Sequence, residues 1–175
     1  IVKTSGGATT LSGTNTHSGG ISILGGSLNV TGSGALGSGA VNIAAGAALN
    51  YTNTNAVTFA NGLSGSGSFN KLGTGQLSFA NNFALGSLNL QAGRTRMNVV
   101  GTTNVTVGAN ATLDGTGRII GNLTNNGTVA PGNSIGTLTV QGNYTHNANS
   151  VLEIEFDDAG NIDLLDVTGN ATLNG

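Results

Sequence analysis

The chain has 175 residues, of which 31 are glycine and only 7% are charged, and its net charge is −2. With 37% hydrophobic residues and so little net charge it is not intrinsically disordered, and it lacks the glycine at every third position that collagen requires. Five basic residues and few aromatics exclude nucleic acid as a partner, and the absence of cysteine excludes disulfides and thiolate chemistry. The composition predicts an all-β protein of many short strands, with Asn, Thr and Ser at the polar positions.

Apolar residues recur at steps of two along most of the chain, the spacing that places alternate side chains on one face of a β-strand. We expect the following residues to point into a core: Leu28 and Val30, Val41 and Ile43, Val57 and Phe59, Leu77 and Phe79, Leu88 and Leu90, Val105 and Val107, and Ile119. The outward positions between them carry Asn, Thr and Ser. Such side chains can bond to the same residue type in a stacked strand, so the pattern predicts polar ladders on the outside.

The alternation is cleanest between residues 129 and 169, which include the only proline of the chain. Strands are predicted at VLEIEF and DLLDVTG, separated by an acidic loop, with Pro-Gly-Asn, Gln-Gly-Asn and Ala-Gly-Asn as turns. By contrast, Gly-Ser runs within residues 31–70 raise the entropy cost of ordering, so we expect the C-terminal third to be the most stable part. The expected core residues of that third are Leu138, Val140, Tyr144, Leu152, Ile154, Phe156, Leu165 and Val167.

Sequence repeats indicate how the strands are arranged. NATLDG at residues 110–115 returns as NATLNG at 170–175, and Lys3 followed by Gly7 returns as Lys71 followed by Gly75. These separations correspond to about three units of roughly 20 to 23 residues, a period typical of solenoids built from coils of strands. A leucine-rich repeat would need a denser leucine pattern and a helical half-repeat, which this sequence lacks. The predicted fold is an all-β parallel β-helix of about eight coils that forms one domain over residues 1–175.

Six of the seven acidic residues lie between Glu153 and Asp166, which makes this stretch the candidate for catalysis by paired carboxylates. Glu153, Glu155 and Asp157 are two residues apart, so we expect them to share the outward face of a strand. No Lys or Arg lies nearby in the sequence to act as a base or charge clamp, although a stacked coil could supply one. We interpret the stretch as a solvent-exposed charged face that also discourages pairing with another chain.

The same stretch offers oxygen ligands for calcium, because Asp157, Asp158, Asn161, Asp163 and Asp166 follow one another closely. The order DDAGNIDLLD matches neither the EF-hand loop nor the calcium β-roll repeat, so an acidic turn is the better interpretation.

Other signals for a site are weak. His17 and His146 are single imidazoles in polar turns, where we expect surface residues and not ligands or bases. Glycine runs such as GSGALGSG lack the Gly-Lys-Ser/Thr ending and the following helix of a phosphate-binding loop. The sequence therefore predicts no catalytic, cofactor-binding or metal site.

Residues 3–30 resemble the passenger-associated transport repeat of Gram-negative autotransporters, in which Leu-x-Gly-x-Asn-Thr-x-Ser-Gly-Gly precedes a strand and Gly-x-Leu-x-Val. His17 replaces the usual aromatic residue, and residues 71–98 are a degenerate second copy without Ser-Gly-Gly. Three later motifs are similar to the last coils of such passengers: Ala130-Pro131-Gly132, Gly136-x-Leu138-x-Val140-x-Gly142 and Asp163-x-Leu165-x-Val167-x-Gly169. The matching positions of the first repeat are Leu11, Gly13, Asn15, Thr16, Ser18, Gly19, Gly20, Gly26, Leu28 and Val30.

The resemblance to autotransporter passengers of type V secretion implies a right-handed β-helix on the cell surface of a Gram-negative bacterium, or secreted from it. It implies an outer-membrane β-barrel of the same polypeptide, absent from this chain, as the partner, so that the chain is a processed product or a fragment. Residues 129–175 would be autochaperone-like coils that fold first. Filamentous haemagglutinin-like exoproteins share this fold.

Three functions are compatible with these patterns. The leading one is a stem that presents a distal region and assists its own secretion and folding. The second is an adhesin or self-association module, whose partners are other copies of itself or a host surface. The third is an enzyme of the polysaccharide lyase type. We favour the stem, and no enzyme activity, because no polar residues converge and the loops between strands are short.

Overall fold

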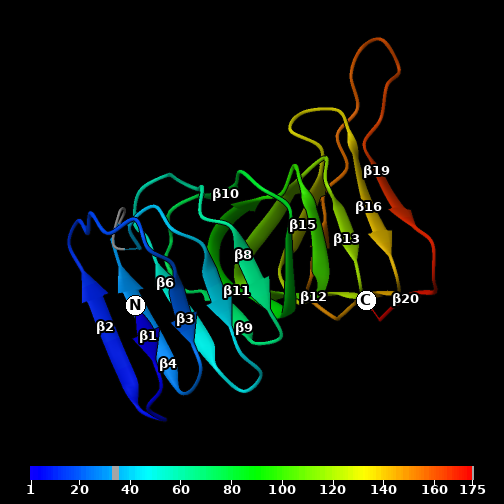
Figure 1. The fold of residues 1–175 in the computed structure, drawn as a ribbon. Coiled ribbons are helices and arrows are strands. Elements are labelled where there is room, and N and C mark those ends of the chain that lie inside the picture. The colour runs from blue at the N-terminus through cyan, green and yellow to red at the C-terminus, as the bar shows by residue number, and fades with distance from the viewer. Residues whose placement is uncertain (33–35, 175) are drawn as a thin grey trace.

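The computed structural model describes residues 1–32 and 36–174, and it contains twenty strands and no helix in that part of the chain. Strands of successive turns pair in parallel, and the turns stack into an elongated rod that runs from β1 and β2 to β19 and β20 (Figure 1). The stack has about seven full turns, close to the eight predicted, so the parallel β-helix is confirmed. The Gly-Ser run at 32–40 lies partly outside the described residues.

Each full turn passes through three sides of the rod. The first side holds β1 (Val2–Lys3), β3 (Ile21–Ile23), β5 (Val41–Ile43), β8 (Leu63–Gly65), β13 (Arg118–Ile120), β16 (Thr137–Gln141) and β19 (Leu164–Val167). The second side holds β2 (Ala8–Ser12), β4 (Ser27–Thr31), β6 (Ala48–Thr52), β9 (Ser68–Lys71), β14 (Leu123–Asn125), β17 (Tyr144–His146) and β20 (Ala171–Leu173). The third side holds β7 (Val57–Phe59), β10 (Leu77–Phe79), β15 (Thr128–Pro131) and β18 (Val151–Leu152). Two long strands, β11 (Phe83–Arg96) and β12 (Val100–Gly115), run through all three sides.

The pairing register confirms the period of the repeat. Leu28 pairs with Leu49 and Leu49 with Phe69, so these turns are 21 and 20 residues apart. The repeated segments, however, lie on different sides. Lys3 ends β1 on the first side, whereas Lys71 ends β9 on the second. Likewise NATLDG lies at the end of β12 on the third side, whereas NATLNG contains β20 on the second.

The core is a column of apolar side chains that extends from Ile21 to Tyr144. The residues expected in the core between Leu28 and Ile119 are all buried except Val57, which is partly buried and packs against them. Ring contacts with centroid separations of 4.6 to 5.9 Å link Tyr51, Phe59, Phe69, Phe79 and Phe83. Such pairs stabilise by about 0.5–1.5 kcal/mol each beyond area burial. The largest core side chains therefore lie in the middle of the rod and include Tyr51, Phe59 and Phe69, which belong to the segment whose Gly-Ser runs raise the entropy cost of ordering.

The predicted strand VLEIEF is wrong beyond Leu152, where β18 ends. Ile154 is 37% exposed and Phe156 is 81% exposed, so neither is a core residue. In β19, Leu165 and Val167 are only partly buried against the core. Of the core residues expected in the C-terminal third, Leu138, Val140 and Tyr144 are buried, so the prediction is confirmed for these three.

The strand ends at this point because of a proline in the preceding turn. Glu153 N donates to Val129 O at 2.9 Å, and the next N–H in this parallel ladder would come from Pro131, which has none. The chain leaves the stack as an arm, defined here as residues 153–163, which projects from the rod before β19 (Figure 1). An isolated antiparallel bridge between Phe156 and Ile162 closes it.

The predicted polar ladders are confirmed on the second side. Asn50 Nδ2 donates to Asn29 Oδ1 at 2.8 Å, Asn70 Nδ2 to Asn50 Oδ1 at 2.7 Å, and Asn89 Nδ2 to Asn70 Oδ1 at 2.8 Å. Asn50 and Asn70 thus use both the amide donor and the amide oxygen between turns, while Asn29 only accepts and Asn89 only donates at the ends of the ladder. On this side of the rod, side-chain hydrogen bonds therefore join four successive turns in addition to the backbone hydrogen bonds.

Candidate functional site

The two lysines of the repeated segments are buried at corners of the rod. Lys3 Nζ donates to Ser5 O and Gly7 O at 2.7 Å and to Gly25 O at 2.8 Å. Lys71 makes the equivalent set of bonds at its own corner, to Gly73 O, Gly75 O at 2.6 Å and Ala92 O at 2.8 Å. Each ammonium group joins the carbonyls of its own turn to one carbonyl of the next turn. These lysines are therefore structural.

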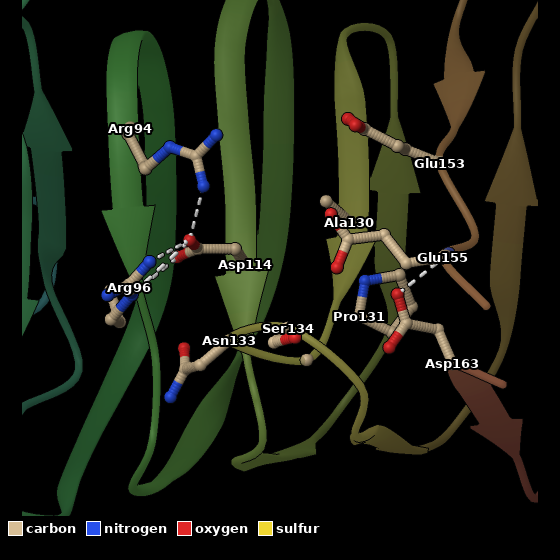
Figure 2. A pocket seen from close by; sticks show the side chains of 11 residues that line it. Arg94, Arg96, Asp114, Ala130, Pro131, Asn133, Ser134, Glu153, Glu155 and Asp163 are labelled. Atoms are coloured by element: carbon tan, nitrogen blue, oxygen red, sulfur yellow. Dashed lines mark hydrogen bonds and ion pairs between the residues drawn. The ribbon is translucent and has the colours of Figure 1, made fainter. Parts of the chain in front are cut away.

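The most highly charged cavity of the described chain lies on the third side and has a volume of about 260 Å³ (Figure 2). In a chain with five basic and seven acidic residues, six of these twelve line this one cavity. Two arginines come from β11, an aspartate from β12, and the remaining acids from the arm, with the loop after Pro131 between them. The charged lining residues are Arg94, Arg96, Asp114, Glu153, Glu155 and Asp163.

One wall of the cavity is an ion-pair cluster. Arg94 and Arg96 are two residues apart on β11, so their side chains share a face, and Arg96 pairs with Asp114 in the β11–β12 register. Asp114 Oδ2 accepts from Arg94 Nη1 at 2.6 Å and from Arg96 Nη2 at 2.8 Å. The hydrogen bond and the charge of Asp114 raise the pKa of Arg96 further above its ordinary value. The Asp114 side chain is only 2% exposed, so the two arginines provide the hydrogen-bonding partners that a buried carboxylate requires.

Asp163, at the C-terminal end of the arm, bonds the arm to the loop after Pro131. Its Oδ1 accepts from Gly136 N at 2.8 Å and its Oδ2 from Glu155 N at 2.9 Å. It is buried, and it ties the loop after Pro131 to both ends of the arm. Asp163 was one of the candidate calcium ligands in the sequence, and both of its carboxylate oxygens accept hydrogen bonds from backbone N–H groups.

The glutamates Glu153 and Glu155 are exposed and lie across the cavity from the arginines (Figure 2). A stacked turn therefore supplies the basic groups that are missing nearby in the sequence. The carboxylate of Asp114 is bonded by two arginines, and that of Asp163 by two backbone N–H groups. The cavity therefore contains ion pairs that join β11 to β12, and exposed carboxylates line its edge.

Asp157 forms the turn at the tip of the arm. Its Oδ1 accepts from Ala159 N at 3.0 Å and Asn161 N at 2.8 Å, and its Oδ2 from Asn161 Nδ2 at 2.7 Å. The bonds from Asn161, chiefly the side-chain one, lower the pKa of Asp157. The interpretation of an acidic turn is confirmed, although Asp157 does not lie on a strand. Asp158 and Asp166 are exposed.

The histidines differ from each other. His146 Nδ1 bonds the hydroxyl of Tyr144 at 2.9 Å on the second side. His17 was expected at the surface, but it is half-buried, and its Nε2 is buried without a partner in the structure. It packs beside Gly37, whose φ of +60° and close approach to His17 O leave no space for a side chain. Within the described residues, no group of three or more His, Cys, Asp or Glu is placed to hold a metal ion.

Sequence reasoning missed the cluster of Arg94, Arg96 and Asp114. The available signal was the spacing of 18 residues between Arg96 and Asp114, which is close to one turn of the solenoid. The cluster becomes visible only when the register of β11 against β12 is known.

No family model matches the chain, and the comparisons with curated proteins and with solved structures found no match either. In the part of the chain that the structure describes, no helix is long and apolar enough to cross a membrane.

Proposed function

We propose that the chain is the β-helical stem of an autotransporter passenger of a Gram-negative bacterium, which spaces a distal region from the cell surface and assists its own secretion. The observation that carries this proposal is that several sets of polar side chains form hydrogen bonds or ion pairs from one turn to the next. The buried lysines, the Asn29–Asn89 ladder and the Asp114 cluster all join one turn to another. We infer a structural role and no enzyme activity.

The dimensions suit a spacer. On the second side, eight steps separate β2 from β20, and at about 4.8 Å per step the stack is roughly 38 Å long. Because each turn pairs only with its neighbours, a folded turn offers a complete edge to the next one. Folding by sequential addition of turns would draw the chain outward and hold it there.

A display fusion tests the stem function. The chain is placed between a reporter epitope and an outer-membrane barrel, and the epitope is measured by flow cytometry on intact cells. We expect display to exceed that of a flexible Gly-Ser linker of equal length and to fall when Leu88, a buried residue, is replaced by Asp. The matched control is Thr106→Asp on the exposed outer face of the neighbouring turn. Equal display by the linker, or no difference between the two variants, would contradict the proposal.

Self-association is the second candidate, and the arm is the observation that favours it. Phe156 is 81% exposed and Ile162 is 62% exposed, so two large apolar side chains project into solvent on one protruding segment. Sedimentation velocity of the chain and of the Phe156→Ser, Ile162→Ser double variant would measure this. A concentration-dependent oligomer that the double variant loses supports self-association, whereas a monomer at all concentrations argues against it.

A further inference from the structure

A second cavity, of about 580 Å³, lies where the third side turns into the first. Asn82, Asn98 and Thr116 line it from three successive corners, and Arg118, Thr139 and Asp166 line it from β13, β16 and β19. It therefore follows the long axis of the rod as a groove across several turns. This groove shares no lining residue with the cavity at Asp114.

Arg118 is the basic residue in this groove, and it differs from every other one in the described chain. It is exposed, and its guanidinium group has no hydrogen bond or ion pair in the described part of the structure. The remaining basic side chains are engaged: Lys3 and Lys71 with backbone carbonyls, and Arg94 and Arg96 with Asp114. Arg118 is thus the lysine or arginine of the described chain whose charged group has no protein partner, and a guanidinium binds a carboxylate with two parallel hydrogen bonds.

The corner asparagines are oriented to add donors. Asn82 Oδ1 accepts from Val100 N at 2.8 Å, and Asn98 Oδ1 accepts from Thr116 N at 3.0 Å. Both side-chain oxygens are held by the backbone of the next turn, and within residues 1–32 and 36–174 the two Nδ2 groups have no acceptor, so they can donate to a ligand. The end of the groove near Arg118 is therefore rich in donors and suited to oxygen acceptors.

The other end of the groove carries an acceptor. In the register of the first side Arg118 pairs with Thr139 and Thr139 with Asp166, so Asp166 lies two steps, about 10 Å, from Arg118. At that distance the carboxylate of Asp166 is largely screened by salt and does not neutralise a ligand at Arg118. Asp166 can accept from hydroxyl groups that lie further along the groove.

The rest of the lining favours a hydroxyl-rich ligand. Threonine hydroxyls and the Gln141 amide alternate along it, whereas the side chains of Val99 and Val100 supply the apolar surface. Pockets for drug-like or cofactor molecules are mostly apolar, and this groove is not. Its length across successive turns suits a chain and not a single small molecule.

We propose that this groove binds an oligosaccharide that carries a carboxylate, with Arg118 pairing with the carboxylate and Asn82, Asn98 and Asp166 bonding the ring oxygens and hydroxyls beside it. The proposal does not depend on the stem function, and Asn82, Arg118 and Asp166 are exposed in the structure. It gives the stem a specificity for acidic sugars.

The test is isothermal titration calorimetry of the full chain with a hyaluronan tetrasaccharide and with its carboxyl-reduced form. We expect Arg118→Gln to weaken binding of the acidic tetrasaccharide by about tenfold or more and to leave binding of the reduced form unchanged. The matched control is Thr106→Glu on the second side, which lowers the net charge by the same amount outside the groove and should bind within about twofold of the native chain. Because Arg118 is exposed and unpaired, its variant should keep the far-UV circular dichroism spectrum of the native chain.

Three results would overturn the proposal. The first is no binding of the acidic tetrasaccharide by the native chain. The second is equal weakening by Arg118→Gln and Thr106→Glu, which would show an effect of net charge alone. The third is competition by free glucuronate with the affinity of the tetrasaccharide, which would show a simple anion site and no groove for a chain.

Discussion

The protein should become more stable as the pH rises from about 8 towards 10, and Lys71 is the reason. Burial lowers the pKa of Lys71 from 10.5 to about 8 in the folded chain. Well below pH 8 the lysine is protonated in both the folded and the unfolded state, so it adds no pH dependence there. Between pH 8 and 10.5 the unfolded chain binds the proton that the folded chain has lost, and the free energy of unfolding therefore rises with pH. At pH 9.5 this lysine should contribute a gain of about 2 kcal/mol over pH 7.5.

Equilibrium unfolding in urea, followed by circular dichroism at intervals of pH, measures this gain. The series should stop near pH 9.5, because burial raises the pKa of Tyr51 and of Tyr144, and the unfolded chain then gains stability by ionising these phenols above about pH 10. The control is Lys71→Met, which keeps the length of the side chain and should lose the rise between pH 8 and 9.5. A native chain whose stability stays flat or falls over this range, in parallel with the variant, would refute the reasoning.

Four further variants test the aromatic core, the Asp114 ion-pair cluster and the attachment of the arm by Asp163. Phe69→Ala removes the centre of the aromatic column and should cost about 3–5 kcal/mol, whereas Phe156→Ala should change stability by less than about 0.5 kcal/mol, as measured by chemical denaturation. Asp114→Asn should cost about 2 kcal/mol, because two arginines lose a charged acceptor, and this loss should shrink in 1 M salt. Asp163→Ala should speed proteolysis within residues 153–163 while the core stays protected in hydrogen exchange; equal cleavage rates would show that this carboxylate does not hold the arm.

The architecture was predictable because it depends on local properties of the sequence. Alternation at steps of two and turn-forming residues specify strands, and polar positions filled with Asn specify ladders such as that through Asn50 and Asn70. These features require no knowledge of which residues become neighbours. The core residues from Leu28 to Ile119 were predictable for the same reason.

The candidate site was not predictable because it depends on register. The strand after Leu152 ends because Pro131 is one turn earlier, and Arg96 meets Asp114 because β11 aligns with β12. Local alternation at VLEIEF favoured a buried strand, and the missing N–H of a neighbour prevented it. The period alone, known to within a few residues, cannot decide such pairings, since a shift of one residue reverses the face of every side chain.

Lys3 and Lys71 end strands on different sides of the rod. The repeated Lys-x-x-x-Gly segments therefore correspond to the bends between two sides, here called corners, and not to equivalent positions of successive turns. In each Lys-x-x-x-Gly segment the lysine bonds backbone carbonyls two and four residues later, so the segment bends the chain through its own contacts. The same bend ends a strand on the first side at Lys3 and on the second side at Lys71. Aligning the repeats by sequence identity would superpose a residue of the first side on one of the second, and would misplace every ladder between them. We therefore expect the Lys-x-x-x-Gly segment to form the same bend when it is placed after another strand of a β-helix, whichever side of the rod that strand occupies.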